Sequence, residues 1–115
     1  MTGKLTVSVH DDAHNQNADD IQYDLWRIND NSNRVNIKHD TIIANSNPHV
    51  LVQANTVDEL GLFEIILYIK DYFESFNENI HVQDSRIIIA FGMNNLNRDH
   101  HLRIFIRPDR YWCTL

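Results

Sequence analysis

The stretch His100-His101-Leu102-Arg103-Ile104-Phe105-Ile106-Arg107 alternates polar and apolar residues from His101 onward, as a β-strand with one buried face does. Because successive side chains on a strand point to opposite faces, Leu102, Ile104 and Ile106 are predicted to face a core. The outward row then holds an imidazole, two guanidinium groups and an aromatic ring, from His101, Arg103, Phe105 and Arg107. Groups roughly 7 Å apart suit a small planar or anionic ligand, although the plain solvated face of a sheet has a similar composition.

Similar apolar patterns recur along most of the chain and predict eight short strands. In the first of them, Leu5, Val7 and Val9 alternate with polar residues. Segment 50–52 is predicted to be a short edge strand, whereas segment 62–69 is apolar on both faces, as a central strand is. The expected strands cover residues 4–11, 21–28, 35–43, 50–52, 62–69, 86–92, 100–107 and 110–115.

Polar segments separate these strands, and in one of the connections the spacing of apolar residues changes from that of a strand to that of a helix. Residues 12–20 are rich in Asn and Asp and predict a loop, and residues 29–33 predict the turn of a hairpin. Within residues 70–79, Tyr72, Phe73 and Phe76 fall at helical spacing, which predicts one short helix after the fifth strand. The expected fold is therefore all-β, a two-sheet sandwich in a single domain over residues 1–115. Its predicted core residues are Leu5, Val7, Val9, Leu25, Ile65, Leu67, Ile87, Ile89, Leu102, Ile104 and Ile106.

Composition limits the classes of function. Hydrophobic residues make up 43% and charged residues 23%, as in a soluble globular protein, and no window approaches the ~18 apolar residues that span a bilayer. We therefore expect no membrane partner. The net charge of −6 argues against a nucleic-acid partner, because phosphate binding needs a basic surface. The single cysteine, Cys113, excludes an internal disulfide, and together with the absence of a signal-like N-terminus it favours a cytoplasmic location.

Several short motifs, taken in order, resemble the transthyretin-like family, whose enzymes are 5-hydroxyisourate hydrolases of urate breakdown. The motifs are Lys-Leu-Thr-Val-Ser-Val-His-Asp at 4–11, Ala18-Asp19-Asp20-Ile21, Asp71-Tyr72-Phe73, the stretch 100–108 and Arg110-Tyr111. The resemblance implies a transthyretin-like sandwich of eight strands and a homotetramer built as a dimer of dimers. It also implies small-molecule clefts between dimers, lined by the first, seventh and last strands. No metal or cofactor is expected.

The catalytic motifs of the hydrolases are only partly present. The family's first-strand His-Val-Leu-Asp corresponds here to Ser8-Val9-His10-Asp11, so Ser8 replaces the catalytic histidine and an imidazole moves to His10. The family's Asp-Gly-Arg corresponds to Asn45-Ser46-Asn47, so Asn47 stands where the substrate-binding arginine is expected. The seventh-strand Tyr-His corresponds to His100-His101, which keeps the histidine at His101. The C-terminal Tyr-Arg-Gly-Ser is absent.

Two functions are consistent with these residues. In the first, the chain is a diverged relative that binds a planar anionic or phenolic ligand, or performs a changed reaction. In the second, it is still a hydroxyisourate hydrolase, with His101 as base, His10 in place of the lost histidine and Arg103 in place of the arginine. The candidate catalytic residues are His101 and His10, and the candidate substrate-binding residues are Ser8, Asn47, Arg103, Phe105 and Thr114.

Two other chemistries are weaker alternatives. His10, His100 and His101 could be metal ligands, but their spacing matches no recognised zinc motif, and neighbours on a strand face opposite ways. Cys113 could act as a nucleophile with His101 if the last two strands pair, although a lone cysteine near a terminus is more often a small buried filler.

Overall fold

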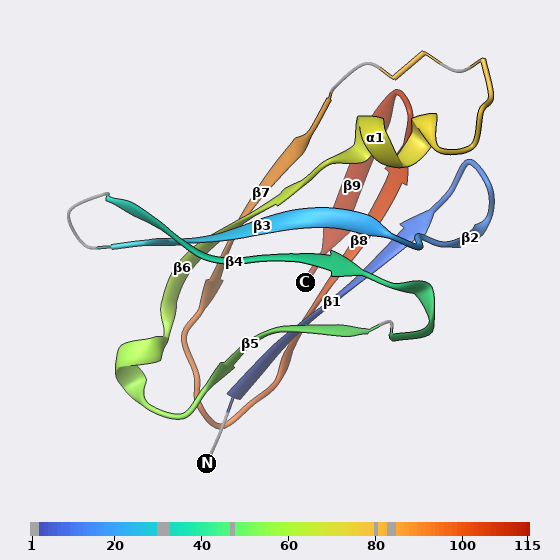
Figure 1. Cartoon of the computed structure of the whole chain (residues 1–115). Helices are drawn as coiled ribbons and strands as arrows, with labels where there is room; N and C mark the ends of the chain where they lie inside the picture. The colour runs from blue at the N-terminus through green and yellow to red at the C-terminus, as the bar shows by residue number, and fades with distance from the viewer. Residues whose placement is uncertain (1–2, 30–32, 47, 80, 83–84) are drawn as a thin grey trace.

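The computed structural model describes residues 3–29, 33–46, 48–79, 81–82 and 85–115, which form two stacked β-sheets (Figure 1). Sheet A contains β1 (Gly3–Asp11), β2 (Gln16–Asn17), β5 (His49–Ala54), β8 (His100–Arg107) and β9 (Arg110–Thr114). Sheet B contains β3 (Ile21–Ile28), β4 (Arg34–Ile42), β6 (Gly61–Leu67) and β7 (Ile87–Met93). The predicted two-sheet sandwich is confirmed.

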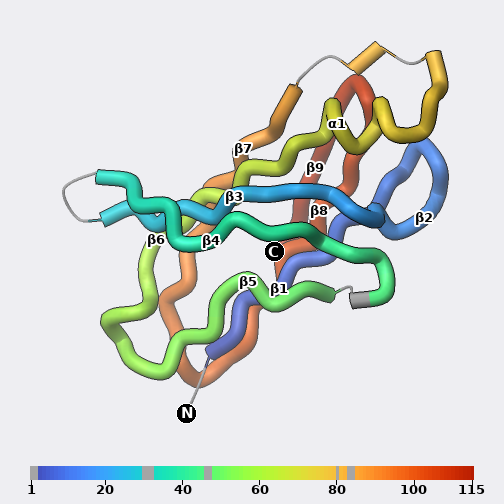
Figure 2. Tube along the Cα trace, viewed as in Figure 1, coloured from blue at the N-terminus to red at the C-terminus, as the bar shows by residue number. Residues whose placement is uncertain are grey.

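The strand order explains the roles predicted for individual segments. Sheet B runs β4-β3-β6-β7, so β6 is a central strand, as its apolar sequence predicted. Sheet A runs β1-β8-β9, and both β5 and β2 pair with the other edge of β1, which makes β5 the predicted edge strand. The Cα trace shows β1, β8 and β9 following one another across this sheet (Figure 2). The β1–β8 pair is parallel, whereas the other described pairs are antiparallel.

The structure differs from the sequence prediction in several places. The predicted loop 12–20 contains the two-residue strand β2, which folds back on the end of β1 and follows Asn15 in a left-handed conformation. The helix α1 (Ile69–Glu74) ends a few residues before the predicted end near residues 77–79, because its last hydrogen bonds become i→i+3 bonds and Asn77 adopts a positive φ of 56°. Two single-turn 3-10 helices, η1 (Ala44–Ser46) and η2 (Val57–Glu59), lie in connections between strands.

The core lies between the two sheets, and every residue predicted for it is buried. On β8, Leu102, Ile104 and Ile106 face this core, so the alternation that identified the strand is confirmed. The α1 residues Tyr72 and Phe73 extend the core at one end. The described part of the chain has no helix that is both long and apolar enough to cross a membrane.

Candidate functional site

Strand register places the candidate residues in rows across the outward face of sheet A. The parallel pairing of β1 with β8 sets each outward residue of one strand beside an outward residue of the other, and β9 extends the rows. Within this arrangement the side chains of neighbouring rows also come into reach of one another. The rows are Thr6 with His101, Ser8 with Arg103 and Thr114, and His10 with Phe105 and Trp112.

His101 is held by two hydroxyl groups from β1. Its Nε2 lies 3.0 Å from Ser8 Oγ, and its Nδ1 lies 2.6 Å from Thr6 Oγ1. Partial burial lowers the pKa of His101, and the nearby Arg103 guanidinium lowers it further. A neutral imidazole with an oriented nitrogen is therefore the prevailing form near neutral pH, and such a group can accept a proton.

An open cavity of about 340 Å³ lies next to this imidazole, lined by His101, Arg103, Thr114 and Leu115. The Arg103 side chain is exposed, and no carboxylate in the described part of the chain forms an ion pair with it. A guanidinium without such a partner can bind an anion directly. One cavity is therefore shared by three of the predicted site residues, His101, Arg103 and Thr114. A fourth, Ser8, contacts the imidazole of His101.

The third row is aromatic and continues along the same face. The Phe105 and Trp112 rings stack with centroids 5.5 Å apart and an interplanar angle of 10°, and the His10 ring meets Phe105 edge-on at 6.1 Å. The Arg110 guanidinium lies over the Trp112 ring at 5.7 Å. Trp112 keeps 38% of its surface exposed, so this row leaves aromatic surface that a ligand or a second copy of the chain can contact.

His10 is placed in this aromatic row and not beside His101. Its Nε2 lies 3.5 Å from Asp12 Oδ1, and its ring contacts Phe105. The position next to His101 that a second histidine would need is taken by Ser8. Asn47, predicted as a substrate-binding residue, lies outside the described residues.

The two alternative chemistries find no support in this geometry. Cys113 pairs in register with Ile104, so it belongs to the opposite face of the sheet from His101 and does not form a nucleophile–base pair with it. Both nitrogens of His101 already contact hydroxyl groups, and the described residues contain no group of three His, Cys, Asp or Glu arranged to hold a metal ion.

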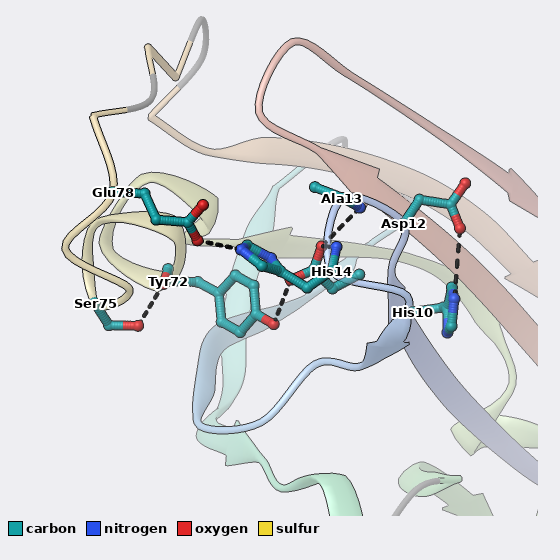
Figure 3. Close-up of polar contacts among 8 residues, drawn as sticks. His10, Asp12, Ala13, His14, Tyr72, Ser75 and Glu78 are labelled. Carbon is teal, nitrogen blue, oxygen red and sulfur yellow. Dashed lines mark hydrogen bonds and ion pairs between the residues drawn. The ribbon is translucent and has the colours of Figure 1, made fainter.

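A second polar cluster, which the sequence did not predict, connects β1 to the segment after α1 (Figure 3). The fully buried Asp11 carboxylate accepts hydrogen bonds from the Tyr72 hydroxyl at 2.8 Å and from the backbone N–H groups of Ala13 and His14 at 2.9 and 3.1 Å. It also contacts His14 Nδ1 at 2.6 Å, while His14 Nε2 contacts the Glu78 carboxylate. The His14 ring stacks on Phe76, with centroids 4.0 Å apart.

This cluster favours a positively charged His14. The hydrogen bond to Glu78 raises the pKa of His14 most, and Asp11 raises it further, against the opposing effect of burial. Burial and the hydrogen bond to Asp11 raise the pKa of the Tyr72 hydroxyl, which therefore stays protonated and donates. The cluster thus joins the β1–β2 turn to the chain after α1 through a charged histidine between two carboxylates. Only the Asp11–His14 spacing is visible in the sequence, because Glu78 is distant along the chain.

Comparison with known proteins identifies the architecture. No protein-family model matches the sequence, and a search of curated protein sequences finds no match either. Among solved structures, (S)-allantoin synthase superposes with a TM-score of 0.83 at 17% identity, over 98% of this chain. This chain spans less than half of that protein, 43% of its length.

Transthyretin structures are similar over nearly their whole length. Sea bream transthyretin in complex with thyroxine gives a TM-score of 0.77 at 14% identity, covering 96% of this chain and 92% of the transthyretin chain. A second structure, transthyretin from Sparus aurata, gives 0.75 at 15% identity, covering 96% and 93%. At these identities the likeness concerns the fold.

Proposed function

From the transthyretin-like fold of this chain, we propose that it is a diverged member of the 5-hydroxyisourate hydrolase and transthyretin-like family that binds a small planar anionic or phenolic ligand. One observation carries the proposal: the oriented His101 imidazole and the exposed Arg103 guanidinium, which pairs with no carboxylate among the described residues, line the same cavity. The guanidinium supplies charge for an anion, and the hydroxyl of Thr114, which lines the same cavity, supplies a hydrogen-bonding partner for a phenol or carbonyl. The aromatic row beside them supplies a flat surface.

Assembly would enclose this site. The cavity is open in the single chain, and the Trp112 ring beside it keeps much of its surface exposed. A second copy packed on the outward face of sheet A would cover both, so we propose a homotetramer built as a dimer of dimers, with the ligand cleft between dimers. The single cysteine suits a reducing cytoplasmic setting.

Retained hydroxyisourate hydrolysis is the second candidate function. It is favoured by the lowered pKa of His101, which leaves a neutral base available at physiological pH, and by Arg103, which can stabilise an oxyanion. It is disfavoured by His10, which lies in the aromatic row and does not contact His101. The ligand-binding function therefore remains our first proposal.

The binding proposal is tested by titrating the protein with thyroxine, an aromatic ligand that carries a phenol and a carboxylate, in a calorimeter. We expect Arg103→Ala to weaken binding about tenfold, because an exposed guanidinium makes a charge-assisted hydrogen bond of modest strength. Arg86→Ala is the matched control, since Arg86 precedes β7 in sheet B, and it should leave binding unchanged. Equal affinities for the parent and Arg103→Ala would remove Arg103 from the ligand site.

Stopped-flow mixing with freshly generated 5-hydroxyisourate separates the two candidate functions. We expect the ring to open no faster than in buffer alone, because the histidine pair of the hydrolases is incomplete here. An acceleration that disappears in His101→Ala would instead establish hydrolysis as the function of the cavity, with His101 as its base.

A further inference from the structure

We propose that Ser8 is a nucleophile activated by His101, and that it transfers the acyl group of small aryl esters through an acyl-Ser8 intermediate. The proposal rests on the proposed ligand cavity beside Arg103 and adds a covalent reaction to it. Ser8 Oγ lies 3.0 Å from His101 Nε2, which is the hydrogen-bond distance required between a serine nucleophile and its base. Ser8, His101 and Thr6 are each partly exposed, so a small substrate can reach them.

The hydroxyl of Thr6 fixes which nitrogen of His101 is the base. Thr6 Oγ1 contacts His101 Nδ1 at 2.6 Å and also lies 3.4 Å from the His100 carbonyl oxygen, to which only a donor can bond. On this basis we assign the Thr6 proton to the carbonyl, so that Thr6 accepts the Nδ1–H of His101. This tautomer leaves the lone pair of Nε2 directed at the Ser8 hydroxyl, which donates to it. Thr6 is a positioning residue, with the orienting role that a carboxylate has in a Ser-His-Asp triad.

The charge around His101 suits a base. The charged side chain that acts on it is Arg103, from its own strand, while β1 contributes the hydroxyls of Thr6 and Ser8 and β9 contributes Thr114. A positive neighbour disfavours protonation in the resting state, so His101 is ready to accept a proton at neutral pH.

The same surroundings suit the acyl-transfer transition state. Arg103 is paired in register with Ser8 and lines the same cavity as His101, so a guanidinium is available to stabilise the oxyanion formed there. The stacked Phe105 and Trp112 rings lie in the following row, where an aromatic leaving group can rest. We therefore expect an aryl ester to react in preference to an alkyl ester.

The reaction has two balanced halves. Ser8 Oγ attacks the ester carbonyl carbon, and its proton passes to His101 Nε2. The tetrahedral intermediate expels the phenolate, which takes that proton and leaves as the phenol, so the acyl group remains on Ser8. Water then attacks the acyl-Ser8 ester and gives a proton to Nε2. The carboxylic acid departs as Ser8 Oγ recovers its proton.

The experiment uses 4-nitrophenyl acetate and the full chain carrying Cys113→Ala, because the exposed Cys113 thiol would itself be acetylated. After an acid quench, peptide mass spectrometry locates the acetyl group, and nitrophenol release gives the rate. We expect acetyl-Ser8 in this protein and none in Ser8→Ala. His101→Gln should acylate about a hundred- to ten-thousandfold more slowly, which is the range for losing a general base. Ser85→Ala, an exposed serine outside the cavity, is the matched control and should react as the parent does.

The role of Thr6 has its own measurement. Thr6→Val removes the hydroxyl and should slow acylation and move the inflection of the pH–rate profile that reports His101. Thr6→Ser keeps the hydroxyl and should restore both the rate and the profile. If Thr6→Val and Thr6→Ser share the parent's profile, Thr6 does not position the base.

Two results would show that Ser8 is not the nucleophile. One is acetyl groups found only on lysines or the N-terminus, and the other is an unchanged rate of nitrophenol release in Ser8→Ala. The first of these outcomes is measured on the protein with Ser8 in place, so it does not depend on how the Ser8→Ala variant folds. Thyroxine binding by the parent separates the two proposals. Binding without acetyl-Ser8 leaves the ligand-binding function in place and rejects the nucleophile, whereas acetyl-Ser8 without thyroxine binding rejects the proposed ligand class alone.

Discussion

Asp11→Ala is expected to lower the free energy of unfolding by about 3–5 kcal/mol, the range for removing one partner of a buried charged pair. Asp11 is fully buried, and its carboxylate accepts from the Tyr72 hydroxyl, from two backbone N–H groups and from the His14 ring. Without it, these donors lose their acceptor in a place that water does not readily reach, and the positive charge on His14 loses its buried partner.

Urea unfolding followed by fluorescence measures this effect, with the denaturant midpoint shifted and its slope retained. Asp12→Ala is the matched control, because Asp12 is the next residue but is partly exposed and its pair with His10 is 3.5 Å long. We expect it to change stability by less than about 0.5 kcal/mol, as exposed ion pairs do. If the two substitutions have equal effects, Asp11 is not the centre of this cluster.

The sequence contained enough information for the strands and the core, because both depend on a local pattern. Alternation along β8 identified which side chains face inward, and the apolar sequence of β6 identified a central strand. These inferences need only the period of a strand and the cost of leaving apolar surface in water. The same period placed Arg103 and His101 on the outward face, where the structure shows them lining one cavity.

Contacts between strands could not be predicted from a local pattern in the sequence. Thr6 was not predicted as a site residue, because its contact with His101 follows from the parallel register of β1 with β8, which no spacing within either strand encodes. The same register places His10 against Phe105 and gives the position beside His101 to Ser8. Likewise, a positive φ at Asn77 ended the helix early, although Tyr72, Phe73 and Phe76 kept the helical spacing in the sequence.

His14→Gln is expected to destabilise the protein by about 2 kcal/mol near pH 6 and by progressively less as the pH rises. The neighbouring carboxylates raise the pKa of His14 above its unfolded value, with Glu78 contributing most and Asp11 next. A group whose pKa is higher in the folded state than in the unfolded state stabilises the folded state. For a histidine this contribution is fully present below the pKa of the unfolded state, roughly 6.5, and it is lost as the pH rises through the pKa of the folded state. The magnitude is that of a hydrogen bond to a charged group.

The pH dependence identifies the interaction, because an uncharged packing role for the His14 ring would make the same loss at every pH. Unfolding of the parent and of His14→Gln is compared between about pH 6 and 9, above the range in which carboxylates titrate. Glu78→Gln removes the largest cause of the raised pKa of His14. The unfolding free energy of this variant should therefore fall less between about pH 6 and 9 than that of the parent. Glu74→Gln should leave the alkaline loss of stability unchanged, since Glu74 lies in α1 and its carboxylate is 3.9 Å from Lys70 Nζ. The outcome that contradicts this prediction is a difference in unfolding free energy between the parent and His14→Gln that stays constant across this range. The stacking of the His14 ring on Phe76, and not its positive charge, would then hold the β1–β2 turn to the chain after α1.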